Sequence, residues 1–368
     1  MLACATLSCD GDGLGDRPDA AEPAAADAES PASQGPLGTD AAVSQVADAA
    51  PVPGAMDREA GAMAVEAGRK DAGPIGHEAS VDATADAAQG PRPMEVPPPA
   101  ICPTPLGLAA GNHRQMLQHE GRMRSYLVHV PSGADATKRL PLVLDFHGYS
   151  RSASSQQSGS GWERVADREG IVVAYPEGVS SSWNVGGCCG GAGTSNVDDV
   201  GFARALITKL ATQLCLDTTR VYASGVSNGA GMSGRLGCEA ADVIAGVALV
   251  SSDLRTKPCT PARPVTEIAF RGTADTLEPY EGGLVGPPGM QFESPGARGS
   301  FELWKNVNQC SGTPAMTVKL CETYSQCASS VEVTLCTLPG VGHSPYQNEL
   351  DFDIAQVSWD AFQRAPRR

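Results

Sequence analysis

The segment VYASGVSNGAGMSGRL contains the residues best suited to nucleophilic chemistry. It places Ser227 between Gly225 and Gly229 in a G-x-S-x-G pattern, directly after an apolar run and directly before a helical pattern. Glycines allow a strand-to-helix turn too tight for larger side chains, and such a turn exposes the serine Oγ at the end of a strand. The helix N-terminus then directs the backbone N–H of Asn228 toward a developing oxyanion. We therefore predict that Ser227 is the nucleophile of an acyl-transfer reaction.

A serine nucleophile needs a base, and the base needs an acid that orients it. With this type of turn the partners follow in the order Ser, Asp or Glu, His. His343 is the only histidine after Ser227, and it follows the last apolar run. Asp275 follows the run at 266–270, and Asp253 follows the run at 244–250. We predict His343 as the base and Asp275 as the acid; Asp253 is the alternative, unless it caps a helix or a turn.

A second oxyanion donor is expected on the loop after an earlier strand. LVLDFHGYS supplies His147, Gly148, Tyr149 and Ser150 there. The glycine lets the backbone approach the substrate, so the N–H of Tyr149 is the candidate donor and that of Ser150 the second choice. His147 is expected to brace the loop. Tyr149 and Trp183 are candidates to stack on an aromatic acyl group, with packing in the core or at the rim as the alternative.

Short apolar runs alternate with longer amphipathic stretches, as in a parallel sheet covered by helices. Continuous apolar runs are typical of strands buried on both faces. The expected strands are residues 125–130, 142–146, 171–175, 221–224, 244–250, 266–270 and 331–338. The expected helices are residues 197–214, the segment after Ser227, and residues 351–364. Residues 278–298, rich in Gly and Pro, are expected to form a long surface loop. The fold class is therefore α/β.

Residues 1–100 differ from the remaining 268 in composition. They contain no Phe, Trp or Tyr and carry 17 acidic and 5 basic residues, whereas residues 101–368 carry 25 acidic and 22 basic residues. A segment without aromatics and with high net charge cannot bury enough apolar surface to fold alone. We predict an acidic Ala/Pro/Asp-rich disordered linker at 1–100 and one catalytic domain at 101–368. Neither part is basic enough to suggest nucleic-acid or anionic-membrane binding.

The first residues, MLACATLSCDGDG, resemble the end of a bacterial lipoprotein signal, with Cys4 or Cys9 as the lipidated residue; an ordinary N-terminus is the alternative. No run is long and apolar enough for a membrane-spanning helix. The expected location is extracellular, or lipid-anchored at the cell surface.

The cysteine content also indicates export, because thiols stay reduced in the cytosol. Ten cysteines fall in residues 101–368, and no pair of C-x-x-C motifs suggests zinc. We predict disulfides among Cys102, Cys188, Cys189, Cys215, Cys238, Cys259, Cys310, Cys321, Cys327 and Cys336. A hairpin of residues 317–324 with 331–338 would pair Cys321 with Cys336 and leave Cys310 for Cys327.

The segment NVGGCCGGAG follows the run at 171–175, so we expect it to form a wall of the active-site cleft that a disulfide anchors. The expected partners of Cys188 or Cys189 are Cys215, Cys238, Cys259 or Cys102. A bond between the two adjacent cysteines is the alternative.

In these motifs the chain resembles the secreted esterase family that includes polyhydroxybutyrate depolymerases and feruloyl esterases of types B, C and D, carbohydrate esterase family 1. The resemblance covers residues 121–368 and rests on RSYLVHVPSG, LPLVLDFHG, VVAYPEG, SWNVGGCCGG, VDDVGFARAL, RVYASGVSNGAGMS and LPGVGH, in that order. It implies an α/β-hydrolase fold, a mostly parallel sheet with helices on both faces. It also implies ester hydrolysis by Ser227, Asp275 and His343 without metal or cofactor.

The chain departs from the family pattern at two places. Gly229 is followed by Ala230 where many relatives have a second glycine, and Ser344-Pro345-Tyr346 stands where many have Trp-Pro-Gly after the histidine. The second departure bears on the substrate pocket, in which we place His147, Gly148, Trp183 and Tyr346. A polymeric ester is expected as substrate, with feruloyl or acetyl esters of xylan first. The alternatives are polyhydroxyalkanoate and, from another class, a non-catalytic binding protein on a hydrolase fold.

Overall fold

A computed structural model describes residues 101–186, 189–285 and 291–366. All of them belong to one compact unit, residues 83–368. The predicted linker at 1–100, with Cys4 and Cys9, lies outside the described residues, and so does Cys188. Within the described part, no helix is both long enough and apolar enough to cross a bilayer.

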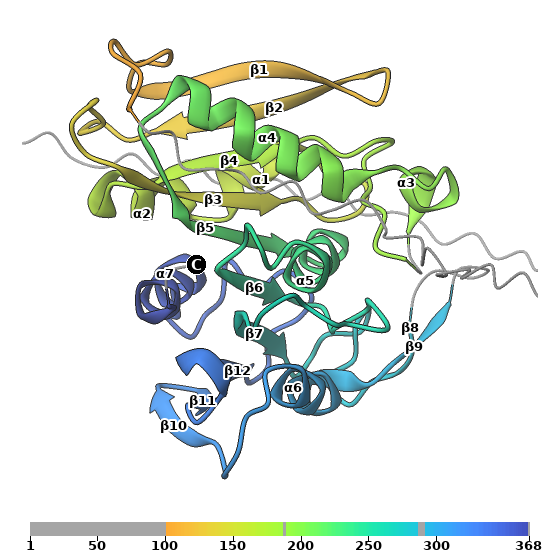
Figure 1. Ribbon diagram of the computed structural model, residues 1–368. Coiled ribbons are helices and arrows are strands. Elements are labelled where there is room, and N and C mark those ends of the chain that lie inside the picture. Colours follow the sequence, from red (N-terminus) through yellow and green to blue (C-terminus); the bar gives the residue numbers. More distant parts are fainter. Residues whose placement is uncertain (1–100, 187–188, 286–290, 367–368) are drawn as a thin grey trace, which may run out of the picture. The chain divides into compact units, whose positions relative to one another are not determined.

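The centre of the unit is a ten-stranded sheet in the order β1-β2-β4-β3-β5-β6-β7-β12-β11-β10 (Figure 1). The strands are β1 Gly111–His119, β2 Arg122–Val130, β3 Leu140–Phe146, β4 Val172–Pro176, β5 Leu216–Val226, β6 Gly246–Val250, β7 Thr266–Gly272, β10 Ala315–Val318, β11 Cys321–Tyr324 and β12 Val333–Leu338. The six central strands from β4 to β12 pair in parallel, and antiparallel hairpins extend the sheet at both edges. All seven expected strands are present, which confirms the α/β class.

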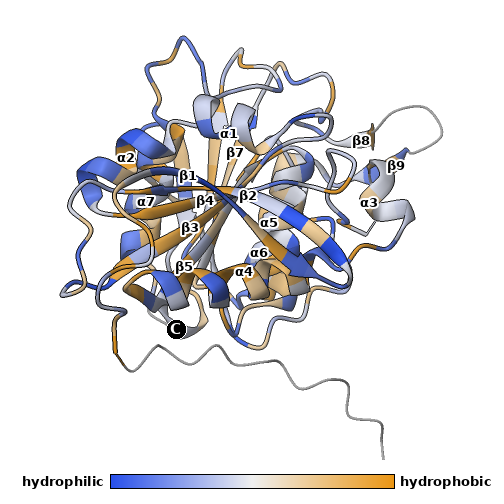
Figure 2. Cartoon of the chain, turned by 90° about the horizontal axis from the view of Figure 1, so that it is seen from above, coloured by the Kyte–Doolittle hydropathy of each residue, from blue (hydrophilic) through white to orange (hydrophobic). Residues whose placement is uncertain are grey.

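The central strands are buried on both faces because helices cover each side of the sheet. The helices are α1 Ala153–Gly159, α2 Trp162–Glu169, α3 Gly190–Thr194, α4 Asp199–Gln213, α5 Asn228–Glu239, α6 Gly296–Val307 and α7 Ile354–Arg364, with a short 3₁₀ turn at Ala328–Ser330. One core contains side chains of α4, α5 and α6, and the other contains those of α1, α2 and α7. Figure 2 shows the apolar strands in the interior and polar residues on the outside of helices such as α2.

Two of the expected helices are present with side-chain caps at their first turns. Asp198 accepts the N–H of Gly201 at the start of α4, and Asp353 accepts the N–H of Gln356 at the start of α7. Such capping satisfies backbone donors that have no partner within a helix. The third, α5, begins directly after Ser227.

The segment 278–298 is not a continuous surface loop, contrary to the expectation. Its described part contains the antiparallel hairpin β8 Gly283–Val285 and β9 Phe292–Ser294, and it includes the start of α6. Helix α6 buries Phe301 and Trp304 against the sheet. The sequence pattern did not predict this helix, because glycines and prolines precede it and lie in its first turn.

Four disulfides join cysteines of the described residues, and they are Cys102–Cys215, Cys238–Cys259, Cys310–Cys327 and Cys321–Cys336. The last two are as predicted: Cys321 lies directly opposite Cys336 in the β11–β12 hairpin, and Cys310 is joined to the remaining Cys327.

Cys189 is also disulfide-bonded, but the four partners proposed for it are joined to one another. That part of the prediction is therefore wrong: the partner of Cys189 lies outside the described residues.

Candidate active site

Ser227 lies on a strained turn between the end of β5 and the start of α5. Its φ is 55° and its ψ is −121°, a conformation that costs energy for any residue other than glycine. The turn is held on both sides, because the N–H of Ser227 donates to the carbonyl of Val250 at 2.8 Å and its carbonyl accepts the N–H of Gly231 at 3.0 Å. The chain thus presents the serine at the carboxyl end of the sheet.

Gly229 is required because the first turn of α5 packs directly on the end of β3. A Cβ at this position would overlap the carbonyl oxygens of Phe146 and His147. The close approach brings the loop with Gly148 next to Ser227; a Cβ on Gly148 would lie 3.6 Å from that of Ser227. The glycines of the motif therefore set the distance between Ser227 and the loop after β3.

Asp275 and His343 meet at the ends of β7 and β12, which are neighbouring parallel strands. His343 Nδ1 lies 2.8 Å from Asp275 Oδ2, and the carboxylate is fully buried. The other oxygen of Asp275 accepts the backbone N–H groups of Leu277 and Glu278, each at 2.9 Å. A carboxylate held in this way orients the imidazole and stabilises its positive charge.

Ser227 and His343 line one cavity of about 580 Å³. Gly148, Tyr149 and Arg151 line it from the loop after β3, and Cys189 from the loop after β4. The remaining wall includes Val226, Thr276, Leu277, Glu278, Leu284, Val285 and Ser344. The cavity thus lies at the carboxyl ends of the strands, where ligands bind in open α/β sheets. Its lining includes several aliphatic side chains.

Asp253, the alternative acid, is engaged elsewhere. Its carboxylate pairs with the buried guanidinium of Arg271 and accepts the hydroxyl of Ser294. The structure brings Asp275, and not Asp253, to His343.

Three of the residues placed in the substrate pocket do not line this cavity. Trp183 is fully buried, with its indole N–H donating to the carbonyl of His147 at 2.9 Å. His147 is also fully buried; its Nε2 accepts the N–H of Gly178 at 3.0 Å and its Nδ1 lies 2.8 Å from the carbonyl of Gly148. Burial lowers the pKa of His147, so the neutral ring braces the loop, as expected. For Trp183, the packing alternative agrees with the structure.

Tyr346 is the third of these residues. Its hydroxyl accepts a hydrogen bond from Gln156 at 3.1 Å, and the same amide donates to both carboxylate oxygens of Asp145 at 3.0 Å. Burial raises the pKa of Asp145 to about 7. Gln156 therefore connects the strand before His147 with the loop after His343. Nothing in the sequence marked Asp145, because a lone acid in an apolar strand has no motif.

The side chain of Asn228 has a role that the motif did not predict. Its Oδ1 accepts the N–H of Trp183 at 2.7 Å, and its Nδ2 donates to the carbonyl of Trp183 at 3.1 Å. This amide thereby fixes the loop after β4 to the start of α5. The start of this loop is thus attached next to Ser227, and Cys189 lines the cavity.

One group among the described residues has the donor atoms for a metal ion. The ligand atoms of His119, Glu120 and Asp198 lie within 4.8 Å of one another, at the turn between β1 and β2 and the start of α4. Asp198 already caps α4 and pairs with His119 at 3.1 Å. None of the three lines the cavity of Ser227.

Comparison with known proteins agrees with the fold and the family. The chain superposes on an acetyl xylan esterase from Aspergillus awamori with a TM-score of 0.51 at 12% identity, covering 69% of this chain and all of that one. The fold is that of the α/β-hydrolases, as the sheet order and the serine turn also show. A family model described as Esterase PHB depolymerase matches residues 124–266.

Two curated relatives extend this match. The chain is 30% identical over 284 residues to a putative esterase, NocK, of Nocardia uniformis subsp. tsuyamanensis. This match covers 67% of this chain and 82% of the relative. It is 36% identical over 245 residues to Feruloyl esterase B of Piromyces equi, which covers 63% of this chain and 45% of the relative. The chain thus spans less than half the length of the second relative. It belongs to the polyhydroxybutyrate depolymerase family of esterases.

Proposed function

We propose that the protein is a serine carboxylesterase in which Ser227 attacks the ester carbonyl, His343 is the general base and Asp275 orients it. The observation that carries this proposal is the hydrogen bond between His343 and Asp275 beside a cavity that Ser227 and His343 share. The strained conformation of Ser227 adds support, because such strain persists where function requires it.

The reaction follows from these positions. His343 Nε2 takes the proton of Ser227 as Oγ attacks, and the imidazolium then gives that proton to the leaving alcohol. Water attacks the acyl-enzyme with His343 again as base, and the acid leaves as Ser227 regains its proton. Asp275 stabilises the imidazolium in both steps.

The N–H groups of Tyr149 and Asn228 are proposed to stabilise the oxyanion. Within the described part, the N–H of Ser150 donates to the carbonyl of Ser181 at 2.9 Å, whereas the N–H of Tyr149 has no backbone acceptor. This difference favours Tyr149 over Ser150. Asn228 is the first residue of α5, where helix N–H groups are directed away from the helix.

For the substrate we propose feruloyl or acetyl esters of plant cell-wall polysaccharide. The relatives named feruloyl esterase and a bifunctional acetylxylan esterase/xylanase of Neocallimastix patriciarum, 27% identical over 63% of this chain and 32% of that one, support this class. Leu277 and Leu284 at the rim, each 63% exposed, offer apolar contact to an aryl acyl group. Short-chain polyhydroxyalkanoate is the second candidate, which the family description favours.

We also propose that the enzyme acts outside the cell, either free or lipid-anchored at the surface. The disulfides of the described part support an oxidising compartment.

The test is turnover of p-nitrophenyl acetate by Ser227→Ala, with Ser158→Ala, an exposed serine of α1, as the matched control. We expect Ser227→Ala to lose turnover by about 10⁶-fold and Ser158→Ala to match the wild type. Turnover by Ser227→Ala equal to wild type would contradict the mechanism, and no turnover by the wild type would favour the non-catalytic binding protein. Rates on methyl ferulate, acetylated xylan and polyhydroxybutyrate film then rank the substrates.

A further inference from the structure

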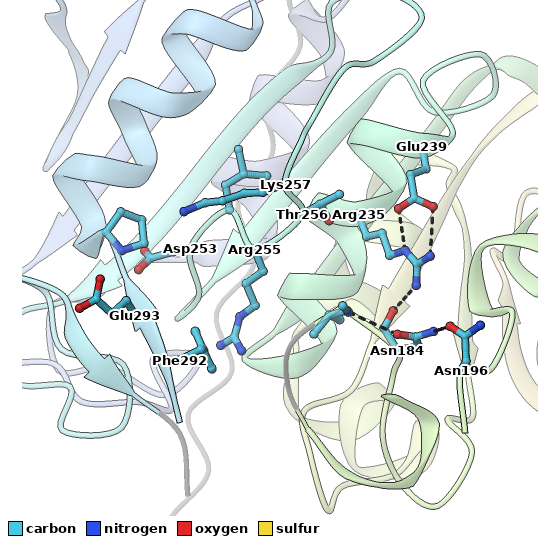
Figure 3. Close-up of a pocket in the computed structure, with 14 residues that line it drawn as sticks. Asn184, Asn196, Arg235, Glu239, Asp253, Arg255, Thr256, Lys257, Phe292 and Glu293 are labelled. Carbon is cyan, nitrogen blue, oxygen red and sulfur yellow. Dashed lines mark hydrogen bonds and ion pairs between the residues drawn. The ribbon is translucent and has the colours of Figure 1, made fainter. Parts of the chain in front are cut away.

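A second cavity, of about 330 Å³, lies beside the cavity of Ser227 and contains none of the three proposed catalytic residues. Figure 3 shows its side chains, which come from the loops after β4 and β6, from α5 and from β9. Its lining is Asn184, Val185, Gly186, Asn196, Arg235, Glu239, Asp253, Leu254, Arg255, Thr256, Lys257, Phe292, Glu293 and Pro295.

The charged groups of this second cavity balance. Its cations are Arg235, Arg255 and Lys257, and its anions are Glu239, Asp253 and Glu293. Two of these six pair directly, because the guanidinium of Arg235 donates to both oxygens of Glu239, at 2.8 and 3.2 Å. Since the lining has no excess of either sign, it does not select an anion or a cation. It offers hydrogen-bond donors and acceptors together, and a hydroxyl group can act as both.

Arg255 places a buried positive charge in the wall of this second cavity. Its side chain is only 5% exposed; Nε donates to Ser252 Oγ at 3.0 Å and Nη2 pairs with Glu278. Nη1 has no hydrogen-bond partner among the described residues. Burial lowers the pKa of Arg255 to about 10, so the group stays protonated at neutral pH. Nη1 itself has almost no accessible surface, so this guanidinium belongs to the wall of the second cavity, where its charge is balanced by Glu278.

An aromatic side chain lies next to this guanidinium. The guanidinium carbon of Arg255 is 4.4 Å from the ring centroid of Phe292, and Figure 3 shows the two side by side. Val185, Leu254 and Pro295 add further apolar surface to the lining. Apolar surface combined with hydroxyl-binding groups suits a sugar ring. At about 30 Å³ per water molecule, the cavity volume of about 330 Å³ equals that of about 11 water molecules. This is room for about one or two sugar rings.

The two cavities are neighbours through two direct contacts. Arg255 lines the second cavity and its ion-pair partner Glu278 lines the cavity of Ser227. In the β8–β9 hairpin, Val285 of the first cavity pairs with Phe292 of the second. The two cavities are therefore separated by a wall that includes this ion pair and this strand pair.

We propose that the second cavity binds an uncharged sugar residue of a polysaccharide whose ester lies at Ser227. This inference rests on the proposed esterase function and specifies its substrate class. A polyhydroxyalkanoate chain carries ester oxygens but no hydroxyl donors along its length, so it cannot use the acceptors of this lining. The second cavity thus favours polysaccharide esters over the polyester.

The test is binding of unsubstituted xylohexaose, a neutral oligosaccharide without esters, to the full chain carrying Ser227→Ala, measured by titration calorimetry. In this background we expect Phe292→Ala to weaken binding by about tenfold and Glu293→Gln by about threefold. Glu293 is exposed and makes no ion pair within the described part, so this second variant should fold normally. Arg255 is left unchanged because its loss would leave Glu278 buried without a partner.

Two matched controls locate the site. Leu284→Ala changes the same hairpin on the side of the Ser227 cavity and should retain the affinity for xylohexaose. Glu120→Gln changes an exposed residue of the β1–β2 turn and should also retain it. Binding that Leu284→Ala weakens and Phe292→Ala does not would place the sugar in the other cavity and overturn the proposal.

The choice of ligand is tested with hexagalacturonate, whose sugar units each carry a carboxylate. Tighter binding of this anion than of xylohexaose would contradict the uncharged ligand. The absence of xylohexaose binding, with turnover of p-nitrophenyl acetate by the wild type intact, would overturn this inference and leave the proposed reaction unaffected. Xylohexaose binding without any turnover by the wild type would overturn the proposed reaction and leave sugar binding in the second cavity unaffected.

Discussion

Asp275 uses both carboxylate oxygens in different ways: Oδ2 contacts His343 Nδ1 at 2.8 Å, and Oδ1 accepts two backbone N–H groups of its own turn. One of those N–H groups belongs to Glu278, whose side chain pairs with Arg255. The orientation of the imidazole therefore depends on a turn that is held by a buried ion pair. Substitutions can therefore distinguish the two candidate acids, because Asp275 contacts His343 whereas Asp253 pairs with Arg271.

Asp275→Asn should lower kcat on p-nitrophenyl acetate by about 10³–10⁴-fold, because the amide favours the wrong histidine tautomer. Asp253→Asn should act mainly on stability. It leaves the buried Arg271 without its anion, and we expect a loss of about 3–5 kcal/mol in the free energy of unfolding, measured in urea. A stable Asp253→Asn with the larger loss of kcat would reverse the assignment.

Gly229→Ala should unfold the turn that presents Ser227. Its Cβ would overlap the carbonyl oxygens of Phe146 and His147, which belong to backbone and cannot move away cheaply. We expect a loss of at least about 3 kcal/mol in stability, together with loss of turnover.

The matched control for this variant is Gly234→Ala in the same helix. There the new Cβ would meet only Leu249 at an ordinary 3.6 Å, so we expect a gain of about 0.5–1 kcal/mol. Equal effects of the two substitutions on urea unfolding would refute the steric explanation.

Replacing both Cys102 and Cys215 by serine should destabilise the protein more than replacing both Cys321 and Cys336. The first bond closes a separation of 113 residues and the second closes one of 15. In the chain-entropy account these loops correspond to about 4.7 and about 3 kcal/mol. The midpoints of urea unfolding for the two double variants give the comparison, and a larger effect of the short loop would contradict it.

Stability should fall as pH rises from about 4 to 7, because burial raises the pKa of Asp145 from 3.8 to about 7. In that range the folded protein keeps a proton that the unfolded chain has released, so the contribution is complete only below the unfolded pKa. It amounts to about 4 kcal/mol at most. Burial also raises the pKa of Glu267, and this adds to the same trend.

Asp145→Asn should therefore flatten the dependence of the melting temperature on pH, whereas Asp360→Asn on α7 should leave it as in the wild type. An unchanged slope of melting temperature against pH in Asp145→Asn would show that this carboxyl does not cause the pH dependence.

Prediction from the sequence was most accurate where residues suited to catalysis directly follow recognisable strands. The strand at 221–224 leads into Ser227, and the runs before Asp275 and His343 are strands, so the carboxyl ends of parallel strands bring these residues together. The pairing of Cys321 with Cys336 followed from the hairpin register in the same way.

Prediction failed where contacts between residues distant in sequence determine the structure. The polar strand β1 has a burial pattern that alternates between half-buried and exposed, with too little apolar contrast to identify it. Trp183 appeared suited to a pocket wall, but its burial depends on Phe146, His147 and Asn228, which are distant in sequence. The partners of Cys189 could not be inferred from spacing, because spacing does not determine disulfide connectivity.

The bond from Cys102 to Cys215 has a mechanical consequence. Cys215 directly precedes β5, a central strand of the sheet and the one that ends at Ser227. Tension applied to the chain before Cys102 passes through this covalent link to β5. The edge hairpin β1–β2, whose hydrogen bonds would otherwise open one by one under load, is bypassed. An enzyme pulled by its N-terminal segment would therefore keep its first two strands in place until the sheet centre itself yields.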